Sequence, residues 1–202
     1  MPMRTTAVTV AVAVALGGGA AACSGDDGEA DELRAQLAEV TTERDELQAR
    51  LDADAERSDK TVEVREAIRA ILDDPAAYGT EDEAIDLLAS YASSDARMRD
   101  DALGSAPMRQ AWYETLYGQA VDAEIEVVHQ WFSPDGSQSG GLWVWRGTNL
   151  AGNPFELVGV QIDTHDDEGR VTDEWVIYPY PDDYVVEAFE GAGTPVSGIW
   201  DD

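Results

Sequence analysis

The stretch VDAEIEVVHQWF, residues 121–132, decides the fold class of this chain, because its hydrophobic period changes to two residues. One set of side chains falls on every second position: Ile125, Val127, His129 and Trp131. Successive side chains of a β-strand point to opposite faces, so this alternation predicts a strand. We therefore expect His129 and Trp131 to face the interior together with Ile125.

Three more strands are expected after this one, separated by turns rich in Gly, Asn, Asp and Pro. The strands are predicted over residues 142–146, 155–164 and 171–178, and the connections over 133–141, 149–154 and 166–169. Short turns between successive strands indicate an antiparallel meander. Pro179 and Pro181 end the last strand, and a short helix is expected over 183–189.

Three helices are expected before the strands. The first follows Thr61 and carries one apolar face: Val64, Ile68, Ile71 and Leu72. The second opens at Thr80, which has the spacing of a capping box with Glu83. The third is aromatic and covers about residues 107–117, including Trp112. Helices followed by an antiparallel meander define the α+β class.

A heptad pattern precedes these helices. Its apolar positions are Leu33, Leu37, Val40, Leu47 and Leu51, and Arg44 fills the position that completes the series. The pattern predicts a helical stalk over residues 33–58, and the polar residues 58–61 are expected to separate it from the domain helix. Two interpretations remain open: a coiled coil that forms a homodimer or other assembly, and a single helix that acts as a spacer.

The N-terminus reads as a secretory signal. A short charged start is followed by the apolar run TTAVTVAVAVAL, by small residues and by Cys23, the only cysteine. Residues 1–22 resemble a bacterial lipoprotein signal peptide, although Ala20 stands where that pattern usually has Leu or Val. The resemblance implies that Cys23 carries lipid such as palmitate and anchors the chain to the extracytoplasmic face of the cell membrane. Residues 23–32 would then form a flexible acidic tether.

The composition excludes several classes of function. The chain has 42 Asp and Glu against 13 Lys and Arg, a formal net charge of −29. No basic surface for nucleic acid can be built from it. One cysteine excludes a disulfide framework and a Cys-rich zinc site, and no cofactor or metal is expected. His165 lies near Asp163, Asp166 and Asp167. We interpret that group as a solvated hairpin turn in preference to a cation site.

Four segments resemble the nuclear-transport-factor-2-like superfamily, and in particular its SnoaL-like branch of polyketide cyclases and relatives. They are DDALG at 100–104, WRGTNLAG at 145–152, FELVGV at 155–160 and GRVTDEW at 169–175. The likeness covers residues 60–190 and implies a cone, in which a curved antiparallel sheet wraps three helices around one deep pocket. Members of this superfamily include enzymes and binding modules, so the fold alone does not set the function.

Only some of the catalytic residues of this superfamily have counterparts in this chain. Pro179 stands where the cyclase branch has an acid–base Asp, and a proline cannot transfer protons. A ketosteroid-isomerase-like scheme could use Asp100 or Asp101 as base and Asp163 or Gln161 at the oxyanion site. The tyrosine that this scheme needs on its first helix corresponds to about Ile68, so that hydrogen-bond donor is missing.

We expect a pocket for a small apolar ligand. Its predicted lining is Trp112, His129, Trp131, Gln161, Trp175 and Tyr178. The preferred interpretation is a non-catalytic lipoprotein domain that binds such a ligand or a protein. The alternatives are an isomerase- or cyclase-type enzyme that uses Asp100 or Asp101, and a structural module assembled by the coiled coil. A C-terminal tail is expected over residues 191–202.

Overall fold

The computed structural model describes residues 27–118, 120–180, 185 and 188. The signal peptide (1–22), Cys23, the C-terminal tail (191–202) and most of the short helix expected over 183–189 lie outside these described residues. The chain divides into two compact units, Met1–Arg44 and Asp45–Asp202, and helix α1 (Asp27–Asp73) contributes to both.

Helix α1 corrects two expectations. It begins at Asp27, inside the segment expected to be a flexible tether, and it continues through residues 58–61, where a break was predicted. Thr61 does not cap a new helix: its side chain is fully buried, and its hydroxyl donates to the Gly136 carbonyl at 2.8 Å. The polar residues near 58–61 therefore serve contacts with the rest of the second unit and do not end the helix.

The apolar heptad positions of α1 are exposed in both units. Leu33, Leu37 and Val40 of the first unit and Leu47 and Leu51 of the second each have more than half of their surface exposed. The described residues thus offer these side chains no apolar cover. The coiled coil and the homodimer stay predictions.

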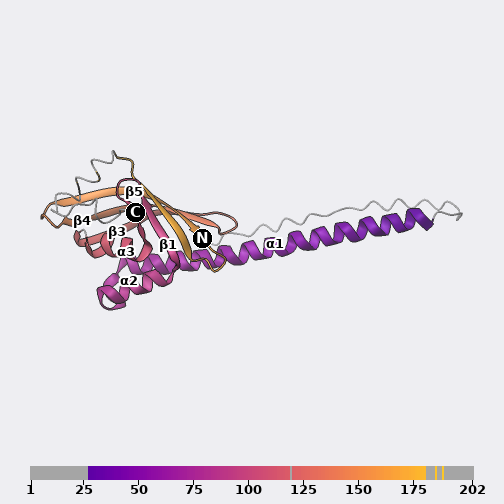
Figure 1. Cartoon of the computed structure of the whole chain (residues 1–202), viewed down its shortest axis with the longest axis horizontal. Helices are drawn as coiled ribbons and strands as arrows, with labels where there is room; N and C mark the ends of the chain where they lie inside the picture. Colours follow the sequence, from indigo (N-terminus) through magenta and orange to yellow (C-terminus); the bar gives the residue numbers. More distant parts are fainter. Residues whose placement is uncertain (1–26, 119, 181–184, 186–187, 189–202) are drawn as a thin grey trace. The chain divides into compact units, whose positions relative to one another are not determined.

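The second unit continues with helical elements and strands, and two strands that were not predicted lie between the second and third expected helices (Figure 1). The helical elements after α1 are η1 (Pro75–Tyr78), α2 (Glu81–Ser90), α3 (Met108–Tyr113) and the π-helical turn η2 (Glu114–Gly118). The strands are β1 (Ala92–Asp100), β2 (Gly104–Pro107), β3 (Ala120–Phe132), β4 (Gln138–Asn149), β5 (Pro154–His165) and β6 (Val171–Ile177). The α+β class and the four predicted strands are confirmed, and so is the Thr80–Glu83 capping box.

The described strands form one six-stranded sheet in the order β2-β1-β6-β5-β4-β3. Strands β1 and β2 were not predicted, and β1 pairs in parallel with β6, so the sheet is mixed and not purely antiparallel. The sequence of β1, ASSDARMRD, shows no clear alternation of apolar and polar residues. Only Ala96, Met98 and Asp100 alternate inward at its end, and the pairing with β6 shifts register between Ala92 and Arg97.

The hydrophobic core fills the space between the helices and one face of the sheet. On the helices its buried members include Ile68, Ile71, Ile85, Leu88 and Trp112, and on the strands Trp143, Trp145, Leu157, Val171 and Val176. Every second residue of each strand faces this core, and the polar residues at those positions are therefore buried as well.

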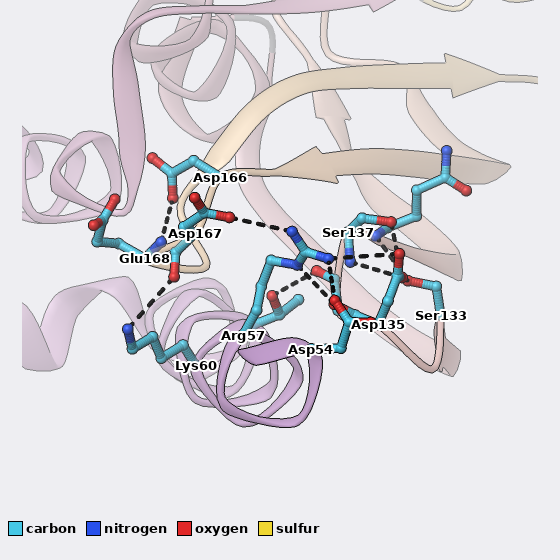
Figure 2. Close-up of polar contacts among 12 residues, drawn as sticks. Asp54, Arg57, Lys60, Ser133, Asp135, Ser137, Asp166, Asp167 and Glu168 are labelled. Atoms are coloured by element: carbon cyan, nitrogen blue, oxygen red, sulfur yellow. Dashed lines mark hydrogen bonds and ion pairs between the residues drawn. The ribbon is translucent and has the colours of Figure 1, made fainter. Parts of the chain in front are cut away.

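Two hairpin turns of the sheet contact helix α1 at residues 57–61 (Figure 2). In the β3–β4 turn the carbonyl of Asp135 accepts from Arg57 Nε at 2.7 Å. In the β5–β6 turn, Asp167 Oδ1 accepts from Arg57 Nη1 at 3.1 Å. Gly136 and Gly169 bring the turn backbones against the helix backbone at residues 57–61, with positive φ angles of 68° and 75°. These contacts explain why the helix is not interrupted here.

Candidate functional site

A pocket opens between the helices and the inner face of the sheet. The cavity volume is about 60 Å³, and the space between the lining atoms reaches about 630 Å³ only when open solvent at the mouth is included, so a ligand that fits is small. Its apolar walls include Ile68, Leu72, Trp112, Leu116, Trp143 and Val176. Its polar lining residues are Arg65, Asp100, Thr115, Gln161, Glu174 and Tyr178. A mostly apolar hollow with a few polar groups is the usual form of a small-molecule site.

Two cross-strand rows place the polar groups on the inner face. In one row, Gln161 of β5 pairs with Val176 of β6, which pairs with Asp100 of β1. In the next row, Asp163 of β5 pairs with Glu174 of β6. Neighbouring rows on one face lie two residues apart along each strand, so the three carboxyl groups are brought to one region of the sheet.

Asp100 presents a carboxylate at the pocket wall. Its Oδ1 accepts from the backbone N–H groups of Ala102 and Leu103, both at 2.9 Å, and its Oδ2 accepts from the Tyr178 hydroxyl at 2.8 Å. Burial raises the pKa of Asp100 to about 6, although these three hydrogen bonds oppose the shift. A carboxyl with such a pKa is largely ionised at neutral pH and is a stronger base than an exposed Asp.

Glu174, unlike Asp100, is largely protonated at neutral pH. Burial, and then the charge of Asp163, raise the pKa of Glu174 to about 8, while Arg65 acts against this shift. Arg65 Nη1 forms an ion pair with Asp163 Oδ2 at 3.2 Å, and the two side chains are only 3% and 0% exposed. At neutral pH the pocket therefore holds a largely ionised Asp100 and a largely protonated Glu174.

Arg65 also has unused hydrogen-bonding capacity. Its Nε is buried and has no hydrogen-bond partner among the residues that the structure describes. Buried N–H groups are rarely left unpaired, since the loss of hydration is costly. Arg65 lines the pocket, but its Nε has almost no surface open to solvent, so an oxygen atom of a ligand or of water could complete this bond only if neighbouring atoms move aside.

The structure brings four of the nine predicted site side chains to the pocket wall: Asp100, Trp112, Gln161 and Tyr178. Asp163 lies behind the wall, against Arg65. Asp101 is exposed and does not line the pocket, so Asp100 is the only one of that pair that does. Trp175 is also outside: it is 46% exposed because Glu174 and Val176, its neighbours in β6, face inward.

The predicted inward position of His129 and Trp131 is wrong. Val127 pairs with Trp143 and His129 with Leu142, so Val128 is an extra residue in β3. Such a bulge reverses which face the following residues occupy. His129 and Trp131 are consequently exposed, whereas Ile125, before the bulge, lines the pocket.

His165 is not part of a solvated turn, as had been expected. It is only 8% exposed, and its ring lies between Ser139 and the Gly169 carbonyl. Asp166, by contrast, does shape the turn, since it accepts from the backbone N–H groups of Glu168 and Arg170. Within the described part of the chain, no group of three or more His, Cys, Asp or Glu residues could hold a metal ion.

Sequence reasoning missed Arg65 and Glu174. Both positions carried a signal: Arg65 lies three residues before Ile68 on the apolar face of the helix, and Glu174 lies two before Val176 on the inward face of β6. A charged residue on an apolar face is the pattern of a buried polar group.

The raised pKa of Asp100 predicts a pH-dependent stability. Because the folded-state pKa of about 6 exceeds the ordinary 3.8, the contribution of the protonated form is fully present below about pH 4. It is lost as the pH rises through 6. Relative to Asp100→Asn, the free energy of unfolding of the wild type should fall by about 2 kcal/mol between pH 4 and pH 7.

Urea denaturation of both proteins at four pH values measures this difference. An Asn side chain keeps an acceptor for Ala102 and Leu103, so the variant should fold. Asp101→Asn, at the exposed neighbour, is the matched control and should follow the wild type. A difference between wild type and Asp100→Asn that does not change with pH contradicts the prediction.

No protein-family model matches the chain, and no curated protein matches it in sequence. Solved structures do match. PrhC from Penicillium brasilianum is 9% identical, with a TM-score of 0.52 over 71% of this chain and 97% of its own. An NTF2-like protein of unknown function from Burkholderia pseudomallei is 11% identical, with a TM-score of 0.51 over 64% of this chain and 97% of its own.

An enzyme is also among the structural neighbours. BvnE pinacolase from Penicillium brevicompactum is 15% identical, with a TM-score of 0.45 over 62% of this chain and 93% of its own. At such identities a shared structure speaks for the fold and not for the reaction. The Burkholderia structure and the curved sheet packed against helices show that the domain has the nuclear-transport-factor-2-like fold.

Proposed function

We propose that this domain binds a small, neutral, largely apolar ligand that carries an oxygen acceptor such as a carbonyl. The observation that carries the proposal is the buried Arg65 Nε, which lacks a hydrogen-bond partner among the described residues and belongs to a side chain in the wall of an apolar pocket. Once neighbouring atoms move aside, a ligand oxygen would satisfy this donor, and the apolar walls would cover the rest of the molecule.

The charges argue against an anionic ligand. The chain carries a formal net charge of −29, and Asp100 is largely ionised in the pocket at neutral pH. Both would repel an anion. A carbonyl or ether oxygen could accept from Arg65, from protonated Glu174 or from the Gln161 amide without adding negative charge.

Matched pairs of compounds test the binding. Neutral monocyclic and bicyclic ketones, each with its parent hydrocarbon, are added while the melting temperature is measured. A compound that binds only the folded state raises it by mass action. We expect ketones to raise it more than their hydrocarbons do.

Two variants on adjacent residues locate the effect. Val176→Phe fills the pocket and should abolish the shift, whereas Ile177→Phe lies on the opposite, more exposed face of β6 and should preserve it. Circular dichroism checks that both variants fold. The proposal is refuted if no ketone raises the melting temperature or if Val176→Phe leaves the shift unchanged.

A second candidate function is proton transfer on such a ligand. The specific observation is that Asp100 and Glu174 line one pocket with pKa values of about 6 and about 8. Two carboxyl groups held in different protonation states can act as base and acid. Asp100 would remove a proton from the carbon beside the carbonyl, and Glu174 would donate to the carbonyl oxygen.

Deuterium exchange distinguishes catalysis from binding. A ketone that raises the melting temperature is incubated with the protein in D₂O, and exchange at the carbon beside the carbonyl is followed by NMR. Asp100→Asn should remove any enhancement over buffer, and Asp101→Asn should keep it. Binding without enhanced exchange would leave the first proposal standing and reject the second.

We infer that the chain is a lipoprotein anchored through Cys23 on the extracytoplasmic face of a bacterial cell membrane. The support is the sequence alone: an apolar run and small residues directly before the only cysteine. Among the described helices, none is both long and apolar enough to span a membrane. Acyl chains on Cys23 would supply the anchor.

Expression in a bacterial host tests the anchor. Mass spectrometry should find acyl groups on Cys23, and the wild type should sediment with membranes while Cys23→Ser does not. A wild type that lacks lipid and stays out of the membrane fraction refutes the inference.

A further inference from the structure

The face of the sheet that points away from the pocket carries an exposed apolar surface, which we call the outer patch. Its members alternate with the inward-facing residues of strands β3 to β6. They are Trp131, Leu142, Val160, Ile162, Trp175 and Ile177. Five of them are 36% to 46% exposed, and Ile162 is half-buried. The described part of the chain therefore leaves this face uncovered, and apolar surfaces of this extent usually mark an interaction site.

Strand pairing joins these side chains into two neighbouring rows. One row holds, from β3 to β6, Trp131, Gly140, Ile162 and Trp175. The next row holds, from β4 to β6, Leu142, Val160 and Ile177. Rows that lie two residues apart along each strand are neighbours on the same face. The six apolar side chains consequently form one continuous surface across four strands.

Local features hold the two tryptophans on this surface. The extra residue Val128 in β3 turns Trp131 to the outer face. Its cross-strand partner is Gly140, and a Cβ there would lie 2.4 Å from the Trp131 ring, so the indole lies over bare backbone. At the other end of the row, the Arg99 guanidinium lies 5.2 Å from the centre of the Trp175 ring. Both indoles are in contact with neighbours while a large part of each stays open.

Charge points to a second copy of this chain as the partner. The chain carries a formal net charge of −29, so most of its surface would repel another copy and would attract a basic partner. The outer patch contains no charged residue. Beside it, Arg99 pairs with Asp173 at 2.9 Å. Arg146 pairs with Glu126 at 2.8 Å and with Glu156 at 2.7 Å. Two copies can therefore meet at this face with little repulsion.

The size of the face also suits a dimer. Strands β3, β4 and β5 have 12 or 13 residues. With β6 they present a face up to about 40 Å long and about 19 Å wide, on the order of the 800 Å² that each partner of a standard interface buries. Aromatic side chains and a lack of charge are typical of the centre of such an interface.

We propose that two copies of this chain form a symmetric dimer through the outer patch. Use of the same surface by both copies gives a two-fold interface, the commonest form of homo-oligomer. The dimer does not depend on the proposed ligand, because the patch and the pocket lie on opposite faces of the sheet. It also does not need the heptad positions Leu47 and Leu51, which lie on helix α1 and not on the sheet.

Sedimentation equilibrium of the full chain carrying Cys23→Ser, which cannot be lipidated, tests the dimer. We expect a dimer with a dissociation constant of about 1 μM or tighter. Trp175→Glu and Val160→Glu each bring a carboxylate of one copy into the apolar interface and near that of the other. Each variant should raise the dissociation constant about a hundredfold or more. Circular dichroism checks that the variants fold.

Two control variants locate the interface. Tyr78 of η1 is 39% exposed, as Ile177 is, but lies outside the sheet, so Tyr78→Glu should leave the dissociation constant unchanged. Leu47→Glu, at a heptad position of α1, should also leave it unchanged. A monomeric Cys23→Ser chain overturns the proposal. A dimer that Leu47→Glu abolishes and Trp175→Glu preserves also overturns it, because association would then belong to the helix.

Radical labelling of the chain with Cys23→Ser alone covers the case in which a patch variant does not fold. Hydroxyl radicals modify exposed side chains, and the labelling is compared between dilute and concentrated protein. Labelling of Trp131 and Trp175 should fall as the concentration rises, while labelling of Tyr78 should not change. If the two tryptophans are labelled equally at both concentrations while sedimentation shows monomer turning into dimer, the outer patch is not the interface.

Discussion

Arg65→Met is expected to lower the free energy of unfolding by about 3–5 kcal/mol. Arg65 and Asp163 form a buried ion pair at 3.2 Å, and removal of the guanidinium leaves the Asp163 carboxylate fully buried without its cation. The Met side chain retains much of the packing volume, so the loss is mainly electrostatic. Urea denaturation at pH 7 measures it.

Two further variants separate this effect from simple loss of an arginine. Arg146 pairs with Glu126 and Glu156 on the surface, with 38% of its side chain exposed, and Arg146→Met should lower the free energy of unfolding much less than Arg65→Met does. The double variant Arg65→Met/Asp163→Asn removes both buried charges and should recover a large part of the loss. Equal costs for the two arginines would contradict the assignment.

Gly136→Ala is expected to lower the free energy of unfolding by about 2–6 kcal/mol, the sum of backbone strain and overpacking. A Cβ at Gly136 would lie 2.5 Å from backbone atoms of Ser58, and its φ is +68°. Neither backbone can move without breaking the contacts between the hairpin turn and α1, such as the Thr61–Gly136 hydrogen bond.

Gly152→Ala is the matched control. Gly152 also has a positive φ, +87°, but a Cβ there would meet nothing within 4 Å. It should therefore cost only the strain of the backbone conformation, about 1–2 kcal/mol. Thermal and urea unfolding of both variants give the comparison. If Gly136→Ala and Gly152→Ala lower the free energy of unfolding equally, the close contact between Gly136 and the helix does not contribute to stability.

The sequence predicted what depends on local periodicity. The α+β class, the capping box of α2 and four strands follow from patterns that neighbouring residues create. Asp100, Gln161 and Tyr178 were also found as pocket residues, and Gln161 lies on a strand whose alternation is regular. These features need no knowledge of which strand pairs with which.

What it could not predict depends on pairing between distant segments. The bulge at Val128 reverses the faces of His129 and Trp131, and nothing in β3 alone marks it. The polar sequence of β1 becomes a strand because β6 pairs with it in parallel. Residues 58–61 stay helical because two hairpin turns contact them. Arg65 and Glu174 are buried together only because α1 crosses the row that contains Asp163.

A methyl NMR map of ketone binding tests the pocket proposal most directly. Methyl groups of Ile, Leu and Val are labelled, and a ketone that raises the melting temperature is added to saturation. Ile68, Leu116 and Val176 line the pocket, whereas Val160 and Ile177 lie among the exposed side chains. We predict shifts confined to the first three residues, with Val176 changed and its neighbour Ile177 unchanged. Shifts at Val160 and Ile177 with none at Val176 would place the ligand elsewhere and contradict the proposed site.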